Sequence, residues 1–294
     1  MPPLFRRRAS TVSIISIQRK SFEIIGMSLA PLPLDHQGPI ARGAALLRLM
    51  ATAGRRGMAL TAMSDITGLP ISTVHRLLAQ LVRQRLAVQL DASRRYAIGP
   101  LAYELGLSAA QQFDVRQVCR PAMEKLAADT AETVYLVQRS GLEAVCIDLV
   151  PGPSAVRVLT LQVGSRRPLG LGAGGLAILA TLDDDEREDV FSRVMGQIES
   201  EWRFAPQELR ESMARARLAH DAVIRNRITP GVTAMGRSFK DSLGQVLGAV
   251  TVAGVNARMT ESRMSQHRQH LLAATRAIEK ALRGQQWARY ASDV

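Results

Sequence analysis

The stretch from Leu60 to Arg85 alternates apolar and polar residues with the spacing of two helices. A short first helix has one apolar face, and a longer second helix has an apolar stripe at i, i+3, i+4 and i+7. The residues of these two faces are Leu60, Met63 and Ile66, then Val74, Leu77, Leu78 and Leu81. Gly68-Leu69-Pro70 separates the helices, because Pro70 cannot continue the first and suits the first turn of the second. The pattern predicts a helix-turn-helix.

The opposite face of the second helix is polar and basic. It carries Ser72, Thr73, His75, Arg76, Gln80 and Arg83. Donors that can reach phosphates and base edges are typical of a recognition helix, although an ordinary solvated helical hairpin would look similar. The next segments favour DNA binding. Residues 87–90 and 96–98 predict two short strands around a polar turn, with Arg94 and Arg95 at the tip, where a DNA-binding wing would sit.

Helical patterns also precede and follow this segment. Residues 40–53 have apolar positions at helical spacing and Gly54 after them, which predicts a helix that ends there. Residues 58–60 predict a small strand against the wing, and residues 100–113 a short linker helix. Residues 39–99 are therefore predicted to form a winged helix-turn-helix DNA-binding domain.

From Asp114 onward the patterns predict an α+β domain over 114–284, with helices flanking an antiparallel sheet. The predicted helices span 115–129, 173–182, 184–196, 206–223 and 260–283. The predicted strands form two hairpins, 133–139 with 144–150 and 232–239 with 245–255, and a further strand covers 155–163.

The sequence GLPISTVHRLLAQLVRQRLAVQLDASRRYAIGP resembles the signature of the IclR family of bacterial transcription regulators. The family pattern, G-L-P-x-S-T-V-x-R-L-L and then Y-x-L/I-G, is matched at Gly68, Leu69, Pro70, Ser72, Thr73, Val74, Arg76, Leu77, Leu78, Tyr96 and Gly99. In the family a basic residue often precedes Ser-Thr. In this chain the apolar Ile71 occupies that position, so one phosphate contact is expected to be missing.

The resemblance covers residues 40–284. It implies a GAF-like effector-binding domain behind the winged helix-turn-helix, with the linker helix supporting a dimer. It also implies a repressor or activator that binds a palindromic operator as a homodimer or homotetramer.

Charge distribution agrees with a DNA-binding segment near the front of the chain. Between Ile40 and Arg95, nine arginines and two aspartates give a net charge of +7, whereas from residue 111 onward 24 basic and 21 acidic residues give +3. A local basic excess is the electrostatic footprint of nucleic acid binding. Because Tyr96 is the only aromatic residue of 39–99, stacking on single strands is not expected, and double-stranded DNA is the predicted partner.

The 294 residues, 47% of them hydrophobic, suffice for two domains. Cys119 and Cys146 form no CxxC pair and fit a reducing compartment, and no run approaches the ~20 apolar residues of a membrane span. We therefore expect a cytoplasmic, nucleoid-associated protein without a membrane partner. Residues 1–38 lack the continuous apolar region of a signal peptide and are expected to be a disordered basic leader, with Met27 as an alternative start; 285–294 is a predicted tail.

Sequence patterns of catalysis are missing. His267 and His270 have no cysteine or acidic residue beside them in a zinc-like pattern, and neither a G-x-S-x-G elbow nor a base beside a cysteine is visible. The acidic run 183–186 begins a predicted helix, where acids complement the helix dipole. No enzymatic activity, cofactor or metal is expected.

The glycine-rich stretch 164–175 is the second candidate site. Its glycines satisfy G-x-G-x-x-G, but Pro168 interrupts the approach and helices follow, so no nucleotide cofactor is expected. Glycines let the backbone approach a ligand, and the helix starting near Ala173 directs N–H groups and positive dipole toward it. A carboxylate suits such a place.

This stretch also resembles the family segment G-S-R-x-P-L-H-x-T-A-x-G-K-A, which lines the effector pocket, with 224–236 as the matching wall. The effector-binding residues so implied are Leu169, Gly170, Gly172, Ala173, Gly174, Ile224 and Ala234. Glycines replace a family His at 170 and a family Thr at 172, which predicts a roomier pocket and a bulkier, aromatic or alicyclic acid. Arg225 and Arg227 replace acids of many relatives; they favour an anion if they point inward and are merely solvated if they point outward.

The function that follows is sequence-specific DNA binding by a transcriptional regulator whose operator affinity responds to a small organic-acid effector. The alternative is a DNA-binding protein whose ligand-free C-terminal domain only oligomerises. A small-molecule enzyme with an appended DNA-binding domain is a more distant third.

Overall fold

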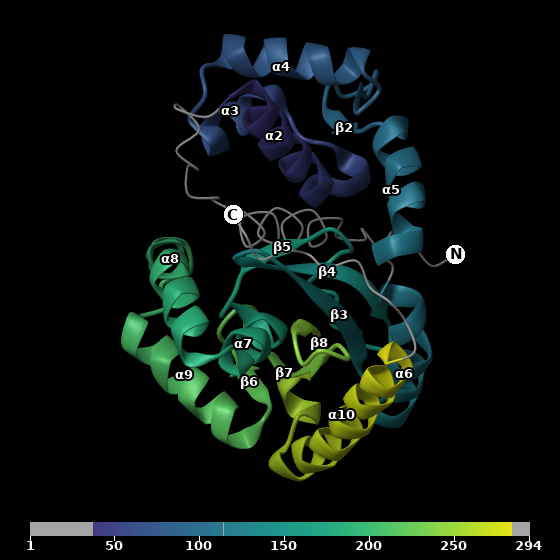
Figure 1. The fold of residues 1–294 in the computed structure, drawn as a ribbon, viewed down its shortest axis with the longest axis vertical. Helices are drawn as coiled ribbons and strands as arrows, with labels where there is room; N and C mark the ends of the chain where they lie inside the picture. The colour runs from purple at the N-terminus through teal and green to yellow at the C-terminus, as the bar shows by residue number, and fades with distance from the viewer. Residues whose placement is uncertain (1–37, 114, 284–294) are drawn as a thin grey trace, which may run out of the picture.

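The computed structural model describes residues 38–113 and 115–283 (Figure 1). The predicted tail, Gly284 and all but the last residue of the predicted leader lie outside these ranges. Within them, every helix is too short or too polar to cross a lipid bilayer.

The N-terminal part is a winged helix-turn-helix, as predicted. Its elements are α2 (Pro39–Ala53), η1 (Gly54–Arg56), α3 (Leu60–Thr67), α4 (Ile71–Arg83), β1 (Ala87–Gln89) and β2 (Tyr96–Ile98). The predicted apolar stripe of α4 packs inward, since Val74, Leu77 and Leu78 are buried with residues of α2 and α3. The strand expected at 58–60 is only an isolated bridge between Met58 and Tyr96, because Leu60 already begins α3.

Helices α5 (Pro100–Phe113) and α6 (Val115–Thr130) lead from this part into the second. In Figure 1, α5 runs down one side of the molecule from the wing toward the sheet. Tyr103, Leu105 and Leu107 of α5 are more than half exposed. The linker helix therefore presents apolar side chains that the other described residues leave more than half uncovered.

The C-terminal part is an α+β domain around one antiparallel sheet. The sheet has the order β5-β4-β3-β8-β7-β6. Its strands are β3 (Thr133–Ser140), β4 (Glu143–Val150), β5 (Arg166–Pro168), β6 (Ala222–Arg225), β7 (Val232–Lys240) and β8 (Val246–Val255). The remaining elements are α7 (Gly172–Thr181), α8 (Asp184–Trp202), α9 (Pro206–Ala219), η2 (Asn256–Arg258) and α10 (Glu261–Leu282). Both predicted hairpins are present.

Helices cover both faces of this sheet, α7 to α9 on one side and α6 with α10 on the other (Figure 1). Strand β3 shows the consequence. Tyr135 and Val137 belong to the core beneath α7, while Val134 and Leu136 belong to the core beneath α6 and α10. A strand buried on both faces reads as a continuous apolar run.

In the C-terminal domain three elements differ from the sequence-based prediction. The helix expected over 184–196 continues to Trp202. The helix expected over 206–223 ends at Ala219, because His220 adopts a left-handed conformation (φ 54°), and residues 222–225 form the edge strand β6 against β7. The strand expected at 155–163 does not form, and the short strand β5 pairs with β4 instead.

The segment 154–164 has no strand ladder and is held by side chains and by a backbone bond, from the Gly164 N–H to the Cys146 carbonyl (2.7 Å). The Tyr135 hydroxyl donates to the Val158 carbonyl (2.5 Å) and accepts from the Thr160 N–H (3.0 Å). Arg258 donates to the Val156 carbonyl and forms a two-pronged pair with Glu132, which is 1% exposed. These bonds satisfy backbone groups that a neighbouring strand would otherwise need to pair.

Burial of His267 on α10 predicts a pH-dependent stability. His267 is 2% exposed, and neither ring nitrogen has a hydrogen-bond partner. Burial, with a smaller effect of Arg263, lowers the pKa of His267 below 6.5. As the pH falls, the unfolded chain therefore takes up the proton before the folded chain does. The free energy of unfolding decreases below pH 6.5 by at most about 1.4 kcal/mol per pH unit, and this decrease stops below the folded-state pKa.

Urea unfolding between neutral and acidic pH checks this. His267→Leu puts an apolar side chain that cannot titrate in the same place and should flatten the pH dependence. Equal slopes in both proteins would contradict the assignment.

Candidate DNA-binding surface and effector pocket

The turn between α3 and α4 positions the polar face of α4. Gly68 adopts the left-handed conformation (φ 69°) and donates its N–H to the Ser64 carbonyl (2.9 Å). The Ser64 hydroxyl donates to the Leu69 carbonyl (2.7 Å), and Leu69 is buried. Glycine reaches this conformation without steric cost, so the turn sets the direction in which α4 leaves.

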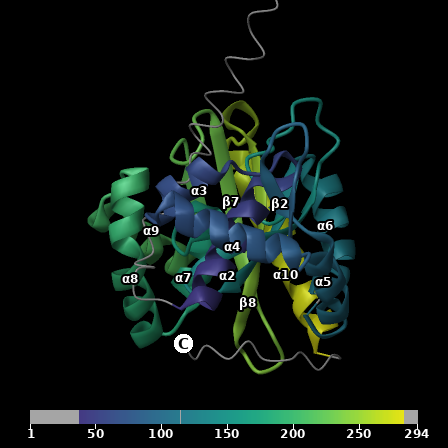
Figure 2. The same ribbon diagram turned by 90° about the horizontal axis from the view of Figure 1, so that it is seen from above.

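Helix α4 lies at the end of the molecule farthest from the C-terminal domain (Figure 1). Seen from above, it runs across the molecule (Figure 2). Ser72, His75 and Arg76 are exposed on it, and Thr73 is half-buried. Its inner face is the apolar stripe described above. The predicted DNA-contacting side chains of α4 therefore share one open, polar surface.

The two wing arginines differ in their freedom. Arg94 is exposed at the tip and has φ 55°, with its N–H bonded to the Leu90 carbonyl (2.8 Å). Arg95 is half-buried, and its Nε donates to the Gly57 carbonyl (3.0 Å). Arg94 is free to reach a phosphate, whereas Arg95 also ties the wing to the turn after α2.

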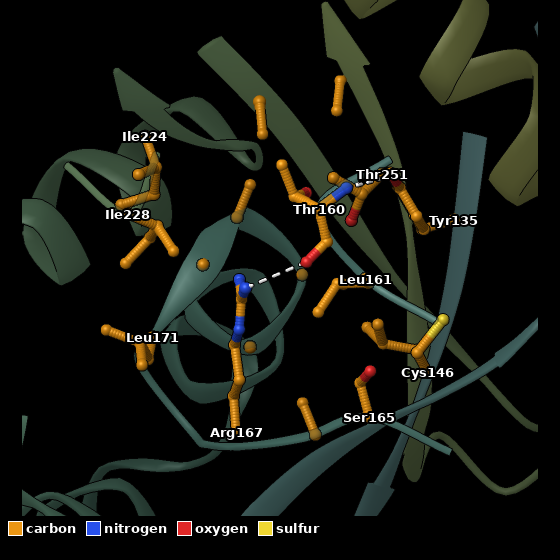
Figure 3. A pocket seen from close by; sticks show the side chains of 18 of the residues that line it. Tyr135, Cys146, Thr160, Leu161, Ser165, Arg167, Leu171, Ile224, Ile228 and Thr251 are labelled. Carbon is orange, nitrogen blue, oxygen red and sulfur yellow. Dashed lines mark hydrogen bonds between the residues drawn. The ribbon is translucent and has the colours of Figure 1, made fainter. Parts of the chain in front are cut away.

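The C-terminal domain encloses a pocket between the start of α7, the sheet and the segment 154–164 (Figure 3). Its cavity offers about 60 Å³ to the centres of water-sized molecules, room for several waters. The apolar lining includes Val137, Leu161, Leu171, Ile224, Ile228 and Val232. The polar lining comprises Tyr135, Cys146, Thr160, Ser165, Arg167, Thr229 and Thr251.

Five of the seven residues expected in an effector site line this pocket: Gly172, Ala173, Gly174, Ile224 and Ala234. Leu169 and Gly170 do not. Leu169 is fully buried in the core, and a Cβ at Gly170 would meet side-chain carbons of Leu179 and Leu209 at 3.1–3.4 Å. Gly170 therefore borders the core and not the pocket, so the absence of a side chain there does not enlarge the pocket.

The arginines Arg225 and Arg227 point away from the pocket. Arg225 pairs with Glu261 (3.1 Å), and Arg227 pairs with Glu208 (2.9 Å) and stacks over the Phe204 ring. Of the two orientations that the sequence left open, the outward one is found.

Arg167 is the cation that faces the cavity, and it was not among the effector-binding residues predicted from the sequence. It follows Arg166 on β5, and consecutive side chains of a strand point to opposite faces. Arg166 pairs with Glu143 (2.8 Å) and bonds the Ser140 hydroxyl (2.9 Å) outside the pocket, so Arg167 is directed inward. The double arginine before Pro168 was the available signal.

Burial shifts three titratable groups of the pocket, and it raises the pKa of the Tyr135 hydroxyl above 10. It raises the pKa of the Cys146 thiol to about 12, so this cysteine stays protonated and unreactive at neutral pH. It lowers the pKa of Arg167 to about 10, which still leaves the guanidinium charged. Within the described residues, no three His, Cys, Asp or Glu side chains gather as a metal site would require.

Comparison with known proteins matches both parts of the chain. The family model for the bacterial transcriptional regulator IclR C-terminal domain matches residues 107–280, and that for the IclR helix-turn-helix domain matches residues 39–91. The chain is 29% identical over 233 residues to the HTH-type transcriptional regulator KipR of Bacillus subtilis, covering 76% of this chain and 89% of the relative. It is 25% identical over 248 residues to the transcriptional repressor IclR of Escherichia coli, covering 83% and 90%.

Solved structures share the fold. An IclR transcriptional regulator from Alicyclobacillus acidocaldarius matches with a TM-score of 0.67 at 21% identity, over 83% of this chain and 98% of that one. An IclR homologue from Microbacterium hydrocarbonoxydans, complexed with 4-hydroxybenzoate, matches with a TM-score of 0.64 at 22% identity, over 84% and 100%.

The close approach of α7 to the sheet predicts the effect of a methyl group at Gly174. A Cβ there would lie 2.5 Å from Val137 Cγ2 and 2.9 Å from Thr251 Oγ1, both on stiff β-branched side chains. Gly174→Ala should therefore lower the free energy of unfolding by about 1–3 kcal/mol, as overpacking does. Urea denaturation measures the change.

Gly196→Ala is the matched control. Gly196 lies inside α8, and a Cβ there has no neighbour within 4 Å. That variant should raise the stability by up to about 1 kcal/mol, because alanine favours the helix. A neutral or stabilising Gly174→Ala would show that α7 does not approach the sheet so closely.

Proposed function

This chain belongs to the IclR family of bacterial transcriptional regulators, which are DNA-binding proteins and not enzymes, and from that membership we propose a specific mode of action. Helix α4 enters the major groove of an operator in the bacterial nucleoid, and a small organic acid in the C-terminal pocket alters the affinity for that operator. The protein acts as a repressor or an activator on a palindromic site, as a homodimer or homotetramer.

The observation that carries the DNA-binding proposal is the open polar face of α4. Ser72, His75 and Arg76 are exposed together, opposite a buried stripe that holds the helix against the domain. Short hydroxyl, imidazole and guanidinium groups on one helix face suit hydrogen bonds to base edges and phosphates. Thr73 lies at the margin of this face, where contact with a phosphate is the expected role.

Two features support the wing and the oligomer. Arg94, exposed at the wing tip, is available for a backbone phosphate, and Arg95 contributes less because it is bonded to Gly57. Tyr103 and Leu107, which are four residues apart on one side of α5 and both exposed, provide an apolar surface for a second copy of the chain. Two copies of α4 would then address the two halves of a palindrome.

The pocket supports an effector. It has an apolar wall, a few polar groups and the N-terminus of α7, which is the common composition of a small-molecule site. The related fold from Microbacterium hydrocarbonoxydans is complexed with a carboxylic acid, 4-hydroxybenzoate. An organic acid is proposed here on those grounds. Effector-dependent affinity requires that the acid bind one arrangement of the protomers better than the other.

Removal of the Arg76 side chain tests the recognition helix. Arg76→Ala should weaken binding to the specific operator by about 10- to 100-fold, the value of one good base or phosphate contact. Because Arg76 is exposed, the melting temperature should stay unchanged. Fluorescence anisotropy on DNA from the gene's own upstream region, across a salt series, measures the affinity.

Arg193→Ala is the charge-matched control, since Arg193 is an exposed residue of α8 that pairs only with Asp189 among the described residues. It should leave operator affinity unchanged. If the Arg76→Ala variant and the native chain bound the operator with equal affinity, the result would contradict the assignment of α4 as the recognition helix.

The same assay tests the effector. In a panel of aromatic and aliphatic acids, at least one should change the operator Kd by about 5- to 150-fold, the usual range of allosteric coupling. Operator binding that ignores the whole panel would favour the alternative in which the C-terminal domain only oligomerises.

A further inference from the structure

We infer that Arg167 is the residue that selects the charge of the effector, by binding the carboxylate of a compact acid with an apolar body. This inference rests on the proposed effector function of the pocket and names the group that decides its ligand class.

The surroundings of Arg167 are the first argument. Its Nη2 lies 3.4 Å from the Thr160 carbonyl, and its guanidinium lies 5.6 Å from the centre of the Trp202 ring. Within the described residues, these are its contacts of a polar or cation–π kind, and no carboxylate forms an ion pair with it. A guanidinium has five N–H donors, so most of its donor capacity is open to the cavity (Figure 3).

Neighbouring arginines show how unusual this is. Arg166, Arg225, Arg227 and Arg258 each pair with a glutamate at 2.6–3.1 Å. Arg167 instead faces a cavity that contains no Asp or Glu in its lining. The Cys146 thiol and the Tyr135 hydroxyl beside it are neutral at pH 7, because burial raises both pKa values. The chain therefore supplies no counter-charge in the pocket.

Burying the charged Arg167 guanidinium without an anionic partner is energetically unfavourable. Burial of a charged group in an apolar site disfavours the charged form, and the lowered pKa of Arg167 has this cause. An arginine–carboxylate pair is strong and often two-pronged. A carboxylate ligand therefore supplies the partner that the fold leaves out.

The rest of the pocket fits the same orientation of the ligand. A Cβ at Gly172 would lie 3.5 Å from the Arg167 Nη1, so the missing side chain leaves this guanidinium room. The first turn of α7, with Ala173 and Gly174 in the lining, adds helix N-terminal N–H groups. Ile224 and Ile228 lie across the cavity from Leu161 and form an apolar wall (Figure 3).

A second polar group in the pocket lacks a partner. Thr251 is 6% exposed, lines the cavity from β8, and its hydroxyl makes no hydrogen bond. A buried polar atom without a partner is unfavourable unless a ligand or water satisfies it. A ligand with a polar substituent on its apolar body would meet this hydroxyl.

The first measurement needs no ligand. Thermal unfolding of the full chain should show that Arg167→Gln raises the melting temperature by about 2–4 °C, since it removes an unpaired charge from the cavity. The matched control is Arg166→Gln, which breaks the pair with Glu143 and should lower the melting temperature or leave it unchanged. A lower melting temperature for Arg167→Gln would contradict the inference.

The second measurement uses acids and their neutral amides. The probes are acetate, cyclohexanecarboxylate and benzoate against acetamide, cyclohexanecarboxamide and benzamide, at constant ionic strength. At about 10 mM, far above the Kd of a specific effector, at least one acid should raise the melting temperature by several degrees more than its amide.

Calorimetric titration of the stabilising acid then compares the variants. Arg167→Gln should weaken its binding at least about tenfold, because hydrogen bonds to charged groups are the strong ones. Arg166→Gln should bind it like the native chain, and Arg167→Lys should keep a preference for acid over amide. Equal stabilisation by acid and amide, equal binding by Arg167→Gln, or no stabilisation by any acid would each overturn the inference.

Operator binding separates this inference from the proposed function. If an amide and its acid change operator affinity equally, the effector function stands and the role of Arg167 falls. If Arg167-dependent acid binding leaves operator affinity unchanged, the role of Arg167 stands and the proposed regulation falls.

Discussion

Close contact between helix α7 and the central strands is the constraint on which the C-terminal domain depends. A Cβ at Gly236 on β7 would lie 2.6 Å from the Ala173 carbonyl oxygen, and one at Gly174 would collide with Val137. Glycine at both positions lets the start of α7 sit directly on the sheet. The pocket exists because this contact brings the helix N-terminus to the apolar face of β3 and β8, while the opposite face is covered by α6 and α10.

The segment 154–164 completes the pocket and also touches the DNA-binding part. Thr160 and Leu161 line the cavity. Gly164 packs against the backbone of Ala51 in α2, and Gln162 lies beside Gly54 at the end of that helix. Since this segment has no strand ladder, its position depends on a few bonds made by the side chains of Tyr135, Arg258 and Arg167 and on the backbone bond from the Gly164 N–H to the Cys146 carbonyl. One wall of the pocket is thus in physical contact with the domain that carries α4.

Elements with strong local signals were predictable from sequence. The stripe of α4, the glycine turn before it and the two long hairpins all appear as expected, since periodicity and turn chemistry are local properties. The errors fall where partners distant in sequence decide. Residues 155–163 have an apolar pattern suitable for a strand, but the Tyr135 hydroxyl bonds the Val158 carbonyl and the Thr160 N–H, and β5 pairs with the edge of β4. Residues 222–225 leave the predicted helix because β7 offers them a ladder.

The sequence by itself determined the family, the winged helix-turn-helix and the glycine-rich start of α7, because each is written in contiguous residues at fixed spacing. Only the tertiary structure decided which cations face the pocket. Arg225 and Arg227 point outward and pair with Glu261 of α10 and Glu208 of α9. Arg167 points inward because Arg166, its neighbour on β5, pairs with Glu143 on the other face of the strand. The direction of a charged side chain depends on where its counter-charges lie in space. Folding sets the distance between two charges that are far apart in sequence, so the sequence alone does not give it.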